Sequence, residues 1–128
     1  MDFRLIDDAV AYLDSQGYNN NYDEFILAGA SLGYNQTAYS AWTEAFDKHI
    51  ELAKQLHHIH EVIVIDHMSC GAYKLLYNKP SLTAAEEVAL HKENFAQFRQ
   101  TMRQRYPECK VKTLLMHLDG TVVDGSTL

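Results

Sequence analysis

The residues best suited to chemistry stand near the middle of the chain, where His67 and Cys70 follow a strongly apolar stretch. Residues 62–65 read Val-Ile-Val-Ile, and such a run is typical of a buried parallel strand, whose carboxyl end faces the crevice where α/β sheets bind ligands. An imidazole nitrogen and a thiolate sulfur are donors that zinc prefers. Two donors do not hold a zinc, however, and packed polar side chains could have the same spacing. Spacing alone therefore favours neither interpretation: His67 and Cys70 could be half of a metal site or simply two packed polar residues.

A second polar motif opens the chain, which begins Met1-Asp2-Phe3-Arg4. A cysteine placed before Met1 would complete the string Cys-x-Asp-x-Arg. With His-x-x-Cys-Gly at residues 67–71, this pattern resembles the β-class carbonic anhydrases over nearly the whole chain. Other landmarks follow in the order of that family: an Ala-Gly turn at 28–29 after an apolar run, a long helical segment, and an Asp-Gly turn at 119–120.

The resemblance implies roles for six residues. His67 and Cys70 would be zinc ligands together with the motif's cysteine, and the bound zinc would lower the pKa of a water toward ~7 so that it can attack carbon dioxide. Asp2 would accept a hydrogen bond at the metal or, in a closed form, bind the zinc itself. Arg4 would hold Asp2 in a bidentate pair that a lysine could not copy. The backbone of Gly29 and Ala30 would lie near the substrate.

The sequence departs from the family at Asp66, because a glycine usually precedes the ligand histidine. A carboxylate at this position would orient the imidazole of His67 as a hydrogen-bond partner, or it would depress activity.

The larger departure is the motif's missing cysteine and the strand that should precede it. Either the natural protein starts further upstream, or the chain has lost the site. We favour the first explanation, because Asp2, Arg4, His67 and Cys70 are all present. The expected protein is therefore a single domain, residues 1–128, that is incomplete at its N-terminus.

The function expected of the complete form is zinc-dependent reversible hydration of carbon dioxide to bicarbonate, with this chain impaired. The alternative is a catalytically silent domain retained for oligomerisation or for binding a partner or an anion. A zinc hydrolase acting on another small electrophile is a third possibility.

Composition excludes some classes of binding partner. The formal net charge of −6 argues against nucleic acid, which needs a basic surface. No apolar run reaches membrane-spanning length and no signal peptide opens the chain, so we expect a cytoplasmic protein without a membrane partner. Aromatic residues between 34 and 46 predict a core or a subunit interface. With the resemblance they predict a homodimer or larger homo-oligomer.

Periodicity predicts alternating helices and strands, hence an α/β fold with a mostly parallel sheet flanked by helices and lacking the family's first central strand. Helices are expected at 6–16, 41–56, 70–77 and from a capping box at Thr83 to about Tyr106. Strands are expected at 25–28, 61–66 and 110–118, with a short pairing after the turn at 119–120.

Two other conspicuous features have simpler explanations. The histidines at 57, 58 and 60 are expected to form a solvated helix end, where cations favour the helix dipole. Cys109 is expected to be a surface thiol.

Overall fold

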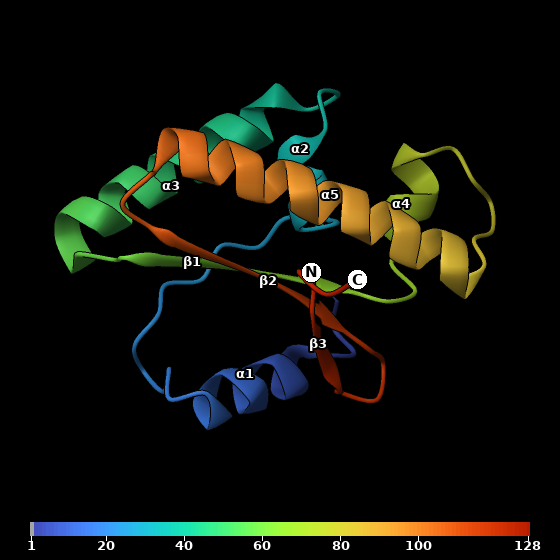
Figure 1. Cartoon of the computed structure of the whole chain (residues 1–128), viewed down its shortest axis with the longest axis horizontal. Helices are drawn as coiled ribbons and strands as arrows, with labels where there is room; N and C mark the ends of the chain where they lie inside the picture. Colours follow the sequence, from blue (N-terminus) through green and yellow to red (C-terminus); the bar gives the residue numbers. More distant parts are fainter. Residues whose placement is uncertain (1) are drawn as a thin grey trace.

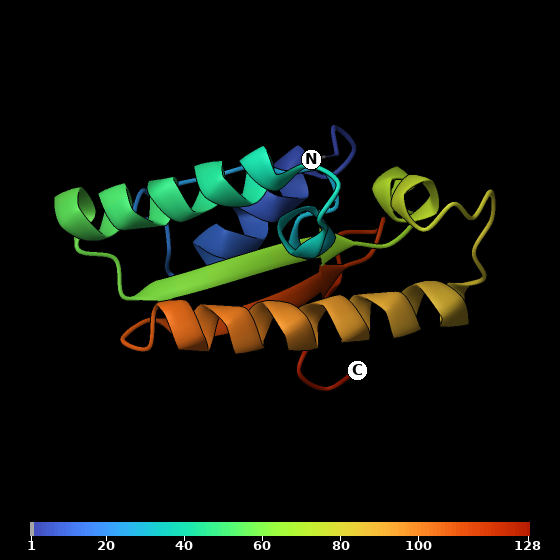
Figure 2. The same ribbon diagram turned by 90° about the horizontal axis from the view of Figure 1, so that it is seen from above.

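The computed structural model describes residues 2–128. In this part of the chain strands and helices do not alternate as expected: three helices precede the first strand, two helices separate it from the second, and a short third strand follows the second directly. In Figure 1, helices α2 to α5 lie on one side of the strands and α1 lies on the other. Figure 2 shows α5 running alongside β1 and β2 for much of their length. The elements, in chain order, are α1 (Ile6–Ser15), α2 (Ser31–Asn35), α3 (Ser40–His57), β1 (Glu61–His67), α4 (Gly71–Leu76), α5 (Ala84–Arg105), β2 (Lys110–Met116) and β3 (Val122–Asp124).

The sheet has the strand order β1-β2-β3. β1 and β2 are parallel, with Glu61 opposite Lys110 and His67 opposite Met116, and β2 and β3 are antiparallel. One pair of each kind makes the sheet mixed, so the expectation of a mostly parallel sheet is wrong. The antiparallel pair arises from the turn at 119–120, because so short a connection can only reverse the chain direction.

The strand expected at Phe25–Ala28 is not formed, and residues 21–27 have no regular secondary structure. A strand needs a neighbour that satisfies its backbone groups. In the described part of the chain, β1 has a paired strand on one side only, where β2 lies. In the described part of the chain, residues 25–28 belong to no strand of the sheet. By the resemblance, the family's first strand would lie between them and β1.

Local signals set the helix boundaries well. Thr83 accepts a hydrogen bond from the backbone of Glu86, whose side chain accepts one from the backbone of Thr83, and this capping box starts α5. α5 ends at Arg105, shortly before Pro107. α2 is a single short helix that the periodicity did not predict.

The main core lies between the strands and helices α2, α3 and α5. Val62 and Val64 of β1 point into it, and Phe95, Phe98 and Met102 of α5 cover them with at most 1% of their surface exposed. Tyr34 is buried there and Phe46 packs against it, whereas Tyr39 is 48% exposed. No residue of α1 is buried, so the core leaves that helix at the surface.

Candidate functional site

Asp2 and Arg4 form a bidentate ion pair at the start of the chain. Arg4 donates from Nε to Oδ1 of Asp2 at 2.9 Å and from Nη2 to Oδ2 at 2.5 Å. The same Nη2 lies 3.5 Å from the carbonyl oxygen of Ser69. The pair therefore contacts the turn after β1, 65 residues along the chain.

That turn carries His67 and Cys70. His67 is the last residue of β1, and Cys70 precedes the first residue of α4. Ser69, between them, has a φ of 62°, which is uncommon for a residue other than glycine and reverses the chain sharply. Nδ1 of His67 lies 3.5 Å from Oδ2 of Asp2. The structure thus brings together the four residues that the sequence predicted as ligands and catalytic groups.

The pKa values of His67 and Cys70 move in opposite directions. Burial lowers the pKa of the His67 imidazole, but its hydrogen bond with Cys70 and the carbonyl of Met68 together raise that pKa above the ordinary value. Burial likewise raises the pKa of the Cys70 thiol, and the contact with His67 outweighs it, so that the thiol pKa is lowered. The lowered pKa of Cys70 favours a thiolate, which is the form that binds metal, whereas the raised pKa of His67 favours the imidazolium, which must lose a proton before it can bind one.

The pKa of Asp2 lies well below its usual range, because the hydrogen bond from the Arg4 side chain stabilises the carboxylate. Asp2 is therefore ionised at all pH values near neutrality and can only accept hydrogen bonds.

His67 and Cys70 suit zinc in one respect that the geometry supplies. Nδ1 of His67 lies 2.9 Å from the carbonyl oxygen of Met68, which can only accept, so Nδ1 carries the proton and Nε2 keeps a lone pair for a metal. The donor set is nevertheless incomplete, because a catalytic zinc takes three protein ligands. Residues 2–128 contain no group of three or more histidine, cysteine or acidic side chains arranged to hold a metal.

A hollow of about 610 Å³ lies beside the ion pair. Its walls are Asp2, Phe3, Arg4, Ile6 and Ile26, and both isoleucines and Phe3 are more than half exposed. The hollow therefore combines a carboxylate held by a guanidinium with an apolar wall, which suits a small apolar ligand better than a charged one. His67 and Cys70 are not among the residues that line it.

Gly29 and Ala30 do not line this hollow. Gly29 has a φ of 77°, and a Cβ there would lie 3.3 Å from the Cβ of Ala72, so the turn packs closely against α4. Ala30 packs against the main core and has a φ of 41°. The sequence prediction for these two residues as substrate contacts stays a prediction.

Asp66 does not orient His67, contrary to the role considered from the sequence. Neighbouring residues of a strand point to opposite faces, and the carboxylate of Asp66 turns into the interior with 2% of the residue exposed. It accepts hydrogen bonds from the backbone and hydroxyl of Ser31 at 2.9 and 2.6 Å, from Tyr73 at 2.7 Å and from Nδ1 of His91 at 2.9 Å. Sequence reasoning missed this network, although the two-residue period of β1 already assigned Asp66 and His67 to different faces.

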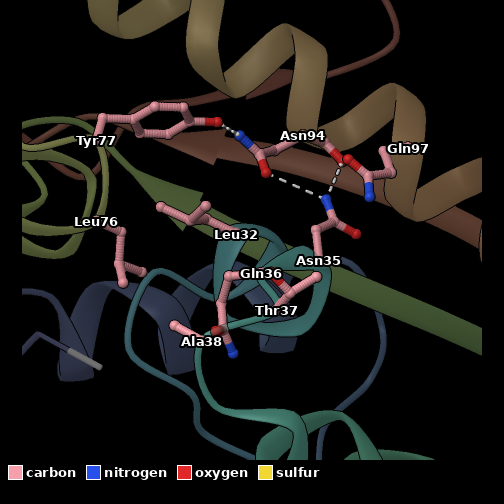
Figure 3. A pocket seen from close by; sticks show the side chains of 9 residues that line it. All are labelled: Leu32, Asn35, Gln36, Thr37, Ala38, Leu76, Tyr77, Asn94 and Gln97. Carbon is pink, nitrogen blue, oxygen red and sulfur yellow. Dashed lines mark hydrogen bonds between the residues drawn. The ribbon is translucent and has the colours of Figure 1, made fainter.

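A second cleft, of about 290 Å³, lies between α2, the end of α4 and α5 (Figure 3). Its polar walls are uncharged, and its side chains bond one another: Asn35 donates to Asn94, and Asn94 donates to the hydroxyl of Tyr77. None of the residues predicted as ligands or catalytic groups lines it.

The expectation that Cys109 is a surface thiol is wrong. Cys109 is only 6% exposed and lies in the main core. Its backbone N–H donates to the carbonyl of Tyr106, and this tight turn carries the thiol inward between α5 and β2. At the other candidate cluster, the side chain of His57 is 58% exposed and pairs with Asp23, as fits a solvated helix end.

Fold and site together define a small α/β domain with a polar cluster at the carboxyl end of β1. The chain is 36% identical over 123 residues to an uncharacterized protein of Rickettsia bellii, a match that covers 95% of the chain and 75% of that protein. It is 37% identical over 123 residues to an uncharacterized protein of Rickettsia conorii, and there the match covers 66% of the relative's length. The chain belongs to the same family as these Rickettsia proteins. No protein-family model and no solved structure matches it.

Among the described residues, no helix is both long and apolar enough to cross a membrane.

Proposed function

We propose that this chain is a β-carbonic-anhydrase-like domain, which hydrates carbon dioxide reversibly to bicarbonate when a third protein ligand completes its zinc site. The observation that carries the proposal is the contact of the Asp2–Arg4 pair with His67 and with the carbonyl of Ser69. The resemblance requires these groups at one site, and they come from opposite ends of a 65-residue span.

The residues present would each have a defined task. Nε2 of His67 and the thiolate of Cys70 would bind the zinc, which supplies an acidified water at neutral pH. Arg4, which binds both oxygens of Asp2, would keep this carboxylate from binding the metal, and Asp2 would then be able to accept a hydrogen bond from the reacting group. The apolar wall formed by Phe3, Ile6 and Ile26 admits carbon dioxide, which has no charge to solvate.

The third ligand would be a cysteine directly before Met1, on a strand that pairs with the free edge of β1. Among the described residues, β1 pairs with a strand only on the side where β2 lies, so an added strand would lie along its other edge. Of this proposed ligand set, residues 2–128 supply His67 and Cys70, and without the third ligand the domain should bind zinc weakly and be impaired as a catalyst.

Exposed apolar side chains near the site and the two free cysteines support a homodimer or larger homo-oligomer in a reducing compartment such as the cytoplasm. Phe3 and Ile6 are 87% and 61% exposed beside the site, and apolar surface of this kind marks interfaces. Both cysteines are free.

The decisive experiment extends the chain by an apolar strand that ends in a cysteine before Met1, with the same extension ending in serine as the matched control. The cysteine form should retain one zinc per chain through dialysis and hydrate carbon dioxide in a stopped-flow pH-indicator assay. His67→Ala and Cys70→Ser should abolish both properties in the cysteine form. Equal zinc retention by the serine form would contradict the proposed ligand set.

A specific result would favour the alternative function. If the cysteine form holds zinc but shows no hydration from neutral to alkaline pH, the domain is catalytically silent and serves oligomerisation or binding. The free edge of β1 and the exposed side chains near Phe3 would then be the surfaces to test.

A further inference from the structure

We propose that Glu87 and His91 of α5 are positioning residues that fix the two candidate zinc ligands, His67 and Cys70, from the buried side of the sheet. The inference rests on the proposed zinc site, because it concerns how His67 and Cys70 are kept in place. Neither α5 residue lies beside the ion pair or its hollow.

Glu87 fixes Cys70 through the backbone. Its Oε1 accepts a hydrogen bond of 2.8 Å from the N–H of Cys70, and Glu87 is only 4% exposed. Cys70 precedes α4 in an extended conformation, so this bond sets where the helix starts and where the thiol points. A buried carboxylate makes a stronger hydrogen bond to an amide than a neutral acceptor does.

His91 fixes the strand that carries His67. The ring of His91 has no exposed surface, and its Nδ1 donates to Oδ2 of Asp66 at 2.9 Å. Tyr73 of α4 donates to the same oxygen at 2.7 Å. The residue before one candidate ligand is thereby tied both to α5 and to the helix that follows the other ligand.

The two positioning residues lie on the same face of α5. Glu87 and His91 are four residues apart. Nε2 of His91 has no hydrogen-bond partner among residues 2–128 and lies 3.9 Å from Oε1 of Glu87. Hydrogen bonds therefore link His91 to Asp66 and Glu87 to the backbone of Cys70, and these two bonded pairs lie next to each other on α5 without a hydrogen bond between them. Buried carboxylates are costly unless they are hydrogen-bonded, and apolar residues would serve equally well if this face of α5 only had to fill space.

The experiment follows Cys70 itself, in a Cys109→Ser background that leaves one thiol. We would compare Glu87→Ala, Glu87→Gln and the control Asn94→Ala. The control removes another buried polar side chain of α5, which donates to Tyr77 and to the carbonyl of Leu90 and accepts from Asn35. The readouts are hydrogen exchange of the Cys70 amide by NMR, alkylation of its thiol by iodoacetamide, and zinc affinity by titration with zinc sulfate, each beside global stability in urea.

Glu87→Ala should speed exchange and alkylation by about tenfold, since a hydrogen bond to a charged group is lost. Glu87→Gln keeps an acceptor and should restore most of the protection, and Asn94→Ala should change neither rate even where it destabilises the fold. Any measurable zinc affinity should fall about tenfold in Glu87→Ala and recover in Glu87→Gln.

Two outcomes would overturn the inference: unchanged exchange and alkylation in Glu87→Ala, or faster rates that Asn94→Ala reproduces at equal global stability. If Glu87→Ala does not fold, hydrogen exchange in the parent protein decides the question. A Cys70 amide that exchanges there without protection would also overturn the inference. Failure of the zinc site is a separate result, since zinc would then bind none of the variants while the amide and thiol readouts still decide the role of Glu87.

Discussion

Arg4 donates hydrogen bonds to both oxygens of the Asp2 carboxylate, with Nε 2.9 Å from Oδ1 and Nη2 2.5 Å from Oδ2. The side chain of Asp2 is 10% exposed, whereas that of Arg4 is 43% exposed. The carboxylate therefore lies between the guanidinium of Arg4 and the imidazole of His67, whose Nδ1 is 3.5 Å from Oδ2. Such a fork is specific to arginine, because an ammonium group is a point donor.

Arg4→Lys should therefore raise the pKa of Asp2 toward its ordinary value. A lowered carboxyl pKa stabilises the fold fully above the ordinary value and loses that effect as the pH falls through the folded value. The stability difference between the parent and Arg4→Lys should be constant above pH ~5 and shrink below ~4, close to the ordinary pKa of aspartate. Urea unfolding at a series of pH values measures it, with Arg103→Lys, an exposed arginine of α5, as the control. A difference that does not depend on pH would contradict the assigned cause.

The part of the fold that the sequence predicted well is the part set by local chemistry. The capping box at Thr83 and Pro107 near the far end bracket α5, and the turn at 119–120 correctly predicted a short antiparallel pairing. The prediction of a strand at residues 25–28 was wrong, because a strand depends on a partner strand that is often distant in sequence. Apolar composition alone cannot supply that partner.

Tyr106 should make the protein sensitive to alkali. Burial, together with its neighbour Asp47, raises the pKa of Tyr106 to about 12 from 10.0. A raised pKa stabilises the fold fully below the ordinary value and loses that effect as the pH rises through the folded one. Stability in urea should therefore fall between pH 10 and 12, and Tyr106→Phe should reduce that fall.

The control for this change is Tyr22→Phe, since Tyr22 is 39% exposed. Absorbance of phenolate near 295 nm would follow ionisation in parallel with unfolding. If Tyr106→Phe and Tyr22→Phe lose stability equally over this range, the burial of Tyr106 is not the cause.

Gly33 should tolerate no side chain. A Cβ at this position would lie 2.4 Å from the carbonyl oxygen of Ala28, which is backbone and cannot move aside cheaply. We expect Gly33→Ala to destabilise the domain by about 1–3 kcal/mol, as overpacking does. Gly71→Ala is the matched control, because a Cβ there meets no atom within 4 Å at the first position of α4.

Gly71→Ala should instead be neutral or raise stability by roughly 0.5–1 kcal/mol, since it restricts the unfolded chain. Thermal unfolding of the two variants gives the comparison. Equal effects at the two glycines would mean that the close approach to Ala28 is relieved by movement of the turn.

The candidate site shows a similar division between what the sequence predicted and what it missed. Asp2, Arg4, His67 and Cys70 were identified from motif spacing, and the structure brings them together. The buried partners behind them, Glu87 and His91, were missed, because a charged residue on a helix is ordinarily solvated. Only the packing of α5 against β1 reveals which of its polar residues point inward.

The strongest test of that buried network is Asp66→Ala. This change leaves the hydroxyls of Ser31 and Tyr73 and Nδ1 of His91 without their acceptor, in a place that water does not reach. Loss of one partner from a buried charged network costs about 3–5 kcal/mol, a large part of the stability of a small domain. Asp14→Ala removes an exposed carboxylate of α1 and should change stability by less than about 0.5 kcal/mol. Urea unfolding of both variants decides the matter: a loss below about 1 kcal/mol for Asp66→Ala would mean that these donors find other partners and that the network does not fix the end of β1.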